Sequence, residues 1–176
     1  MSAVVDGGKL LALMFAVAVL QVSIFASVSA GGGTPDLLLV TLVVVALLRG
    51  PLVGATAGFF GGLVADVALL ETLGLTSLVL TVAGYWIGRY GETTGRDRAH
   101  APLLSVLVVT ILYAVGALVL HFVIGDRVSA GHALGGTLLA TIVFNLVLAV
   151  PVYAACRRFL GRPDPADRIR EVHLLG

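Results

Sequence analysis

Few side chains in this chain could carry out chemistry, and they are scattered. The one lysine, Lys9, precedes the first apolar segment, and the one cysteine, Cys156, lies in the last. The sequence has no H-E-x-x-H zinc motif, no G-x-S-x-G nucleophile elbow and no phosphate-binding P-loop. His121, Asp126 and His132 could meet as a metal site, but their spacing is not diagnostic, and polar residues at a membrane surface are the simpler interpretation. We therefore expect no catalytic, cofactor-binding or metal-binding residues.

A regular series of glycines is more informative, because it ends in an acid. Glycine occurs at every fourth position from Gly50 through Gly54 and Gly58 to Gly62, and the next position in this series is Asp66. This spacing keeps the residues on one helix face, where small side chains let a second helix pack closely. An acid inside a membrane span is costly unless it is protonated, paired or hydrogen-bonded. We expect Asp66 to bond to the next helix start at Gly74–Ser77, and a solute or ion site is the alternative.

Other polar and proline residues are predicted to shape the helices. Thr34-Pro35-Asp36 is typical of a helix start, with a threonine cap, proline in the first position and an acid in the first turn. Gln21 and Asn145 lie near mid-span in the first and last apolar segments, where such amides usually bond across helices. Pro151 should bend the last helix.

The elements that position these residues are predicted to be membrane helices. Hydrophobic residues make up 59% of the 176 residues and charged residues 12%, against about a quarter charged in a soluble domain. A bilayer can solvate the apolar faces that a soluble fold of this size would have to bury. Six apolar segments are predicted to span it: Leu10–Ala30, Pro35–Leu48, Leu52–Leu70, Leu75–Gly88, Pro102–Ile124 and Ala133–Cys156. We therefore expect an all-α bundle of six transmembrane helices over residues 1–161 and a basic tail over 162–176.

The basic residues indicate how this bundle lies in the membrane. If the N-terminus is cytoplasmic and the chain crosses the membrane six times, Arg127 is the only Lys or Arg on the outer side. The inner side then holds Lys9, Arg49, Arg89, Arg96, Arg98, Arg157, Arg158, Arg162, Arg168 and Arg170. Both termini and the polar loop Arg89–Ala101 are thus predicted to be cytoplasmic, and Tyr85 and Trp86 to be anchors at the inner interface. A single bent span over 35–70 would strand Arg49 within the membrane, which favours six spans over five.

The order of these motifs resembles the MreD family of rod shape-determining proteins. The residues that carry the resemblance are Pro35-Asp36, Arg49-Gly50-Pro51, Gly58-Phe59-x-x-Gly62-Leu63-x-x-Asp66, Leu73-Gly74, Gly84-Tyr85, Asn145, Pro151 and Arg157-Arg158. The resemblance spans most of the chain and is strongest over 35–90, whereas residues 91–101 and those after Gly161 match nothing in the family.

This resemblance implies a fold, a location and partners. It implies the fold of the S-component of energy-coupling-factor transporters, in the bacterial cytoplasmic membrane. The implied function is that of a non-enzymatic scaffold of the peptidoglycan elongation machinery, the elongasome, which supports rod cell shape. The implied partners are the single-pass protein MreC, MreB filaments, a SEDS glycosyltransferase and a class B penicillin-binding transpeptidase. No nucleic acid and no cofactor is implied.

An S-component-like subunit that binds a vitamin-like solute is the alternative function. A solute pocket needs convergent polar groups around one cavity. The candidates in the outer half are few: Asp66, Thr76, Ser77, Thr137 and Thr141. We therefore favour a scaffold that holds a partner's membrane helix, with a docking face on the glycines of the third span and less certain contributions from Gln21 and Asn145.

Overall fold

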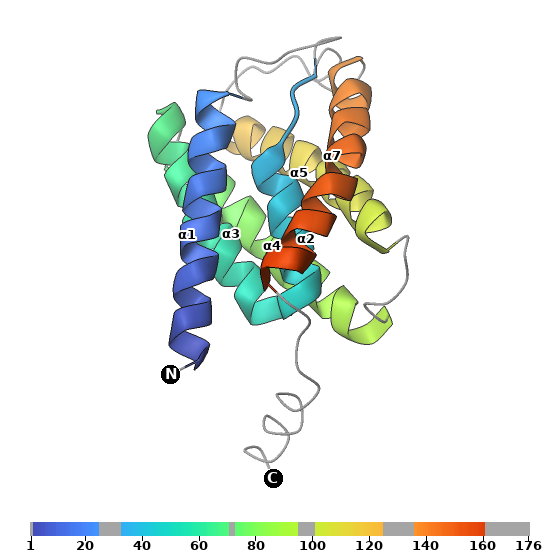
Figure 1. Ribbon diagram of the computed structural model, residues 1–176. Coiled ribbons are helices and arrows are strands. Elements are labelled where there is room, and N and C mark those ends of the chain that lie inside the picture. Colours follow the sequence, from blue (N-terminus) through green and yellow to red (C-terminus); the bar gives the residue numbers. More distant parts are fainter. Residues whose placement is uncertain (1, 25–32, 71–72, 95–100, 125–135, 161–176) are drawn as a thin grey trace.

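The computed structural model describes residues 2–24, 33–70, 73–94, 101–124 and 136–160. These residues form six helices (Figure 1): α1 (Ser2–Ser23), α2 (Leu37–Arg49), α3 (Pro51–Leu69), α4 (Leu75–Thr94), α5 (Ala101–Ile124) and α7 (Gly136–Leu160). The predicted all-α class and the six helices are confirmed. The basic tail at 162–176 lies outside the described residues, so the predicted domain boundary stays a prediction.

The short helix α2 occupies the centre of the bundle. It contacts each of the other five helices, and every residue from Leu38 to Leu48 is buried. A helix that is apolar on all sides is stable in such a place because protein surrounds it completely. Its 13 residues extend about 20 Å, less than the roughly 30 Å hydrocarbon core of a bilayer. Because its neighbours are other helices, α2 does not have to match the thickness of the lipid.

The chain reverses between α2 and α3 at a single glycine. Gly50 has a φ of 95°, a left-handed region that side chains rarely adopt, and its N–H donates to the carbonyl of Ala46 at 2.8 Å. Pro51 then begins α3, where its missing N–H removes no helical hydrogen bond. Residues 35–70 therefore form two helices and not one bent helix, as the count of six requires, and six membrane crossings stay a prediction.

Around α2, the other helices form an incomplete ring. The pairs α1–α3, α3–α4, α4–α5 and α5–α7 pack against each other, whereas α1 and α7 make at most marginal contact. Figure 1 shows α2 between these two helices. On this side Val44, Leu48 and Cys156 form a small buried cluster, flanked by partly buried side chains from α1 and α7: Leu13, Val152, Tyr153 and Leu160. We call these four flanking residues the α1–α7 seam.

The outer faces of the ring helices are apolar, as expected for a membrane bundle. Large hydrophobic side chains are exposed on every one of them, for example Phe15, Phe60, Val82, Leu112 and Val147. Two described helices, Pro51–Leu69 and Thr137–Leu160, are long and apolar enough to cross a membrane, and three shorter apolar helices are Gly7–Ser23, Leu37–Arg49 and Ala101–Gly116. Only 11% of the apolar window in Thr137–Leu160 is buried inside the protein, which is unlike the core helix of a soluble domain.

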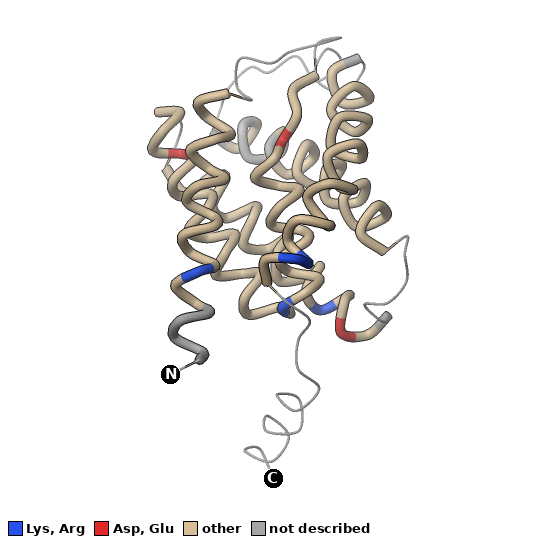
Figure 2. The backbone as a smooth tube through the Cα atoms, viewed as in Figure 1, with Lys and Arg blue, Asp and Glu red and all other residues tan. Residues whose placement is uncertain are grey.

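The Lys and Arg residues of the described helices gather at one end of the bundle, together with Glu92, which pairs with Arg89. Figure 2 shows the Lys and Arg residues near one end, where α1 and α3 begin and α2 and α7 end. They are Lys9, Arg49, Arg89, Arg157 and Arg158. Asp36 at the start of α2 and Asp66 in the last turn of α3 lie toward the opposite end. We call the first end the basic end.

Some helix boundaries differ from those predicted. α1 extends from Ser2 to Ser23. Its start lies eight residues before the predicted start at Leu10, because the helix continues through Gly7, Gly8 and Lys9 beyond the apolar segment. α7 begins at Gly136 and extends past Cys156 to Leu160. The predicted outer turn at 125–132 lies outside the described residues.

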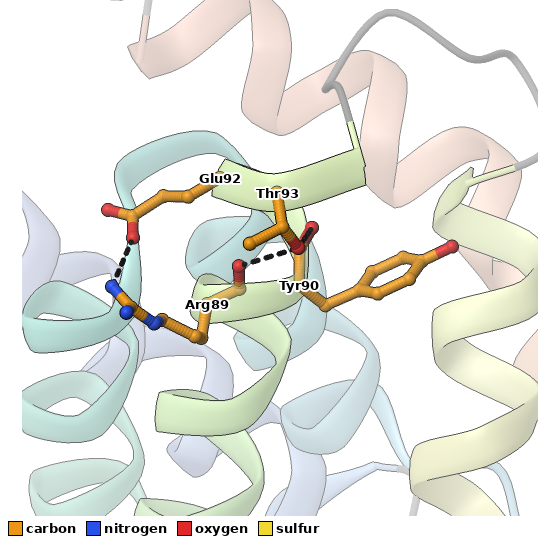
Figure 3. Close-up of polar contacts among 4 residues, drawn as sticks. All are labelled: Arg89, Tyr90, Glu92 and Thr93. Carbon is orange, nitrogen blue, oxygen red and sulfur yellow. Dashed lines mark hydrogen bonds and ion pairs between the residues drawn. The ribbon is translucent and has the colours of Figure 1, made fainter.

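A further difference is at the end of α4, which continues to Thr94, so the polar loop predicted from Arg89 begins as helix. Side chains within this last stretch bond to one another (Figure 3): Arg89 and Glu92 form an ion pair at 3.5 Å, and the Thr93 hydroxyl donates to the carbonyls of Arg89 and Tyr90. Charged pairs three residues apart stabilise an exposed helix without any apolar pattern. Hydropathy alone therefore missed this extension.

Candidate functional site

The glycine face of α3 is covered by α4. A Cβ added at Gly54 or Gly58 would overlap a backbone carbonyl oxygen of α4, and one added at Gly62 would lie 2.5 Å from the Cα of Ser77. The stripe therefore does allow one helix to approach another closely, as predicted. The helix that approaches is the chain's own α4, so the expected docking of a partner's helix on these glycines is wrong.

α4 contributes matching glycines that the sequence analysis missed. A Cβ at Gly84 would overlap the carbonyl oxygen of Gly54, and one at Gly88 would lie 2.5 Å from the Cα of Pro51. Two backbones can approach this closely only where both faces lack side chains, and such packing is a main attraction between helices in lipid. The spacing of four between Gly84 and Gly88 was the signal that could have revealed this second stripe.

Asp66 ties the end of α3 to the start of α4. Its carboxylate is 1% exposed and accepts from the backbone N–H of Gly74 at 2.8 Å, of Thr76 at 3.3 Å and of Ser77 at 3.4 Å. These N–H groups belong to the turn and first helical residues, which have no partner within the helix. Gly74 reaches this position with a φ of 92°. The predicted contact with Gly74–Ser77 is confirmed, and both carboxylate oxygens are bonded to backbone.

Asp36 caps the N-terminus of α2. Its side chain accepts from the N–H of Leu39 at 2.9 Å, and α2 begins one residue later, at Leu37. The helix starts two residues later than the predicted Pro35: the cap is Asp36 and not Thr34, so Pro35 precedes the helix and does not open it. An acid is an effective cap because its oxygen accepts an N–H that the first turn leaves unpaired.

The two mid-span amides meet at this same helix start. Asn145 of α7 accepts from the N–H of Asp36 at 2.8 Å and donates to the hydroxyl of Thr110 on α5 at 3.1 Å. Gln21 of α1 accepts from the N–H of Leu37 at 2.8 Å and donates to the carbonyl of Pro35 at 3.0 Å. The predicted bonds across helices are thus confirmed, and they join α1, α5 and α7 to one end of α2. Thr110 was not predicted, because a threonine within an apolar run gives no separate signal.

At the basic end, Arg49 connects the last residues of two helices. Arg49 ends α2, and its Nη2 donates to the carbonyl oxygen of Leu160, the last residue of α7, at 2.6 Å. A cation at this position satisfies a carbonyl without a helical partner and complements the negative end of the helix dipole. The predicted role of Arg49 at the end of its span is consistent with this contact.

The other predicted residues shape the bundle. Tyr85 and Trp86 are exposed on α4, one turn before Arg89, with ring centroids 6.1 Å apart in an edge-to-face arrangement. Such a pair suits a membrane interface, where each ring has an apolar body and a polar edge. α7 contains Pro151 and bends along its length (Figure 1), as expected for a proline that removes a helical hydrogen bond.

The arrangement offers no chemistry among the residues that the structure describes. They include no group of three or more His, Cys, Asp or Glu residues that could hold a metal ion. Asp66, Gln21 and Asn145 all bond to backbone groups of neighbouring helices. The side chain of His121, and Asp126 and His132 as a whole, lie outside the described residues. The polar groups thus connect helices, and the exposed surface left for recognition is apolar with one basic end.

Comparison with known proteins agrees with the motif order. The sequence model of the family described as rod shape-determining protein MreD matches residues 8–159. Among curated proteins no relative matches the chain. The matched range contains all the described helices except the first residues of α1 and the last residue of α7.

Proposed function

This chain belongs to the MreD family of rod shape-determining proteins, and we propose that it acts as a scaffold that holds the membrane helix of an MreC-like partner against its own bundle. Membership of the family gives the coarser function: a multi-pass protein of the inner membrane, without enzymatic activity, that takes part in determining rod cell shape. The partner, its position and the scaffold mechanism are the proposal.

The observation that carries this proposal is the open side of the helix ring. Neighbouring ring helices pack against each other everywhere except between α1 and α7. A single helix placed along the α1–α7 seam would bridge α1 and α7 over residues of α2 that are already buried. Leu13, Val152 and Tyr153 are only partly buried there, so a partner could remove further apolar surface from lipid. Because attraction between membrane helices depends on close packing, a shallow seam offers more contact than one convex helix face.

The orientation follows from the charges. We place the basic end, with Arg49, Arg157 and Arg158, at the cytoplasmic surface, where loops rich in arginine are retained. Both termini are then cytoplasmic, as six crossings require. The MreB-like filament would meet this surface, whereas the SEDS glycosyltransferase and the transpeptidase would be reached through the partner or within the membrane plane.

A solute-binding subunit with an S-component-like fold is the alternative. Its pocket would need polar side chains that converge on an open cavity. The Asp66 carboxylate is bonded to three backbone N–H groups, and the Ser77 hydroxyl donates to the carbonyl of Phe59 at 2.9 Å. With these groups engaged inside the bundle, the scaffold is the better supported function.

Site-directed photo-crosslinking tests the docking position. A photoreactive amino acid replaces Leu13 or Val152 at the seam, and in matched controls Leu112 on α5 or Val82 on α4, which are 54% and 50% exposed. The protein is co-expressed with the MreC-like protein of the same organism and purified in detergent. We expect crosslinks from both seam positions and not from the controls. Equal crosslinking from Leu112 would show that the partner docks elsewhere.

The scaffold itself is tested by co-purification without a crosslinker. We expect the native protein to retain the MreC-like protein through two purification steps. A thermal-shift screen with vitamins accompanies it, in which the scaffold predicts no shift. Absence of the complex together with a large shift by one vitamin would transfer the assignment to the solute-binding alternative.

A further inference from the structure

Three arginines surround the end of α7 at the basic end. Arg49 donates from Nη2 to the carbonyl of Leu160 at 2.6 Å. Arg157 and Arg158 lie in the last turn of α7, and both are exposed. Arg157 precedes Leu160 by three residues, which is about one helical turn. The guanidinium of Arg49 therefore meets α7 within one turn of the two residues that carry further guanidinium groups.

The charge of this cluster has no counter-ion among the described parts of the chain. The one ion pair between described residues is Arg89–Glu92, on α4. The end of α7 contributes only about half a negative charge through its dipole. Arg49 is partly exposed, but its Nε is buried and has no hydrogen-bond partner. Three cations with one carbonyl contact between them form a site that attracts an anion, and planar guanidinium groups suit phosphate oxygens.

An apolar surface continues from this cluster along α7. Val150 and Val147, which are 62% and 67% exposed, precede Arg157 and Arg158 by seven and eleven residues and so share a face of α7 with them. A soluble anion would have no use for this surface, but acyl chains would cover it. The anion best matched to both parts is therefore one that carries hydrocarbon chains at the membrane interface.

We propose that Arg49, Arg157 and Arg158 bind the phosphate of an anionic phospholipid whose acyl chains lie along α7. This site goes beyond the scaffold function and does not depend on which partner occupies the α1–α7 seam. A bound phosphate would supply a counter-charge that Arg49 does not receive from the described residues at the junction of α2 and α7. The lipid would then act as a clamp on the ends of these two helices.

Native mass spectrometry of the full chain in detergent tests the site. The protein is titrated with phosphatidylglycerol and, separately, with the zwitterionic phosphatidylcholine. We expect phosphatidylglycerol to bind with defined stoichiometry and phosphatidylcholine at least tenfold more weakly. Millimolar inorganic phosphate should not displace the bound lipid. Displacement by inorganic phosphate would mean that the site takes a free anion, and equal binding of both lipids would overturn the proposal.

Variants locate the site. Arg157→Gln with Arg158→Gln changes only exposed residues, so the fold should persist, and affinity for phosphatidylglycerol should fall by roughly tenfold to thirtyfold. Arg49→Lys keeps the charge but loses the planar fork, and should weaken binding less. The matched control is Arg89→Gln, which removes a basic residue that is already paired with Glu92 (Figure 3). A loss in Arg89→Gln equal to that in the double variant would show general attraction to the basic end and contradict a defined site.

Discussion

The side-chain oxygen of Asn145 accepts a hydrogen bond from the backbone N–H of Asp36 at 2.8 Å, although the two residues lie 109 positions apart in the chain. Asn145 is fully buried on the last described helix, and Asp36 is the cap of the central one. In lipid no water replaces such a bond when it is lost. The contact therefore fixes where α7 sits relative to the start of α2.

We predict that Asn145→Leu destabilises the bundle by about 1–3 kcal/mol, because the N–H of Asp36 is left unpaired in an apolar place. Thermal unfolding in detergent measures the effect. Thr110→Val should cost less, since Thr110 meets only the amide end of Asn145. In the Asn145→Leu background Thr110→Val should add almost nothing, because its partner has gone. Fully additive losses would contradict the bond between the two side chains.

A pair of glycines on different helices tests the packing of α3 against α4. Gly58→Ala should destabilise the protein by about 1–3 kcal/mol, because the added Cβ overlaps the backbone of α4. Gly116→Ala on α5 is the matched control: its Cβ would lie 3.5 Å from Cγ1 of Val79, an ordinary contact. There alanine should be neutral or stabilise by up to about 1 kcal/mol. Gly58→Ala should therefore lower the melting temperature, whereas Gly116→Ala should leave it unchanged or raise it.

Asp66 should tolerate an amide better than an apolar side chain. Asp66→Leu leaves the N–H groups of Gly74, Thr76 and Ser77 unpaired, and we expect a loss of about 2–5 kcal/mol. Asp66→Asn keeps one acceptor oxygen and should lose about half as much. The fraction of protein that elutes as a monodisperse peak, followed over a temperature ramp, ranks the variants. If leucine were as well tolerated as asparagine, these bonds would contribute little.

Cysteine labelling tests the orientation of the bundle. In a Cys156→Ala background, a cysteine in place of Arg127 should react with an impermeant thiol reagent added from outside. Cysteines in place of Arg96 or Arg168 should react only after the membrane is permeabilised, since the basic residues are predicted to remain in the cytoplasm. If a cysteine at position 96 were labelled in intact cells, this position would lie outside the cell, and the predicted orientation or the predicted number of crossings would be wrong.

Much of this fold was predictable because the relevant signals are local. The break at Arg49-Gly50-Pro51 depends on adjacent residues, and Thr34-Pro35-Asp36 marked the start of α2 to within two residues, although the wrong residue was taken as the cap. The stripe ending in Asp66 was also readable, since a spacing of four defines one helix face. Even the bonds of Asp66 to the next helix start could be predicted from the sequence, because the connecting turn is short.

Which helix lies against which surface was not predictable from these signals. The glycine stripe shows that some helix approaches, but a stripe on α4 at Gly84 and Gly88 was needed to identify it. The docking face expected for a partner was for this reason assigned to glycines that α4 already covers. Likewise, the length of α2 suggested an incomplete span, whereas its burial by five neighbours depends on the whole topology and leaves no local trace in the sequence.

The central position of α2 has a consequence for how the protein is made. α2 is the second helix to leave the ribosome, but the helices that enclose it include α5 and α7, which are synthesised last. Until α7 arrives, the N–H of Asp36 lacks its acceptor on Asn145, and one side of α2 remains open to lipid. A chain truncated before α7 would therefore stay incomplete at its centre and be a target for membrane proteases. The described bundle therefore cannot take its final form before α7 is synthesised.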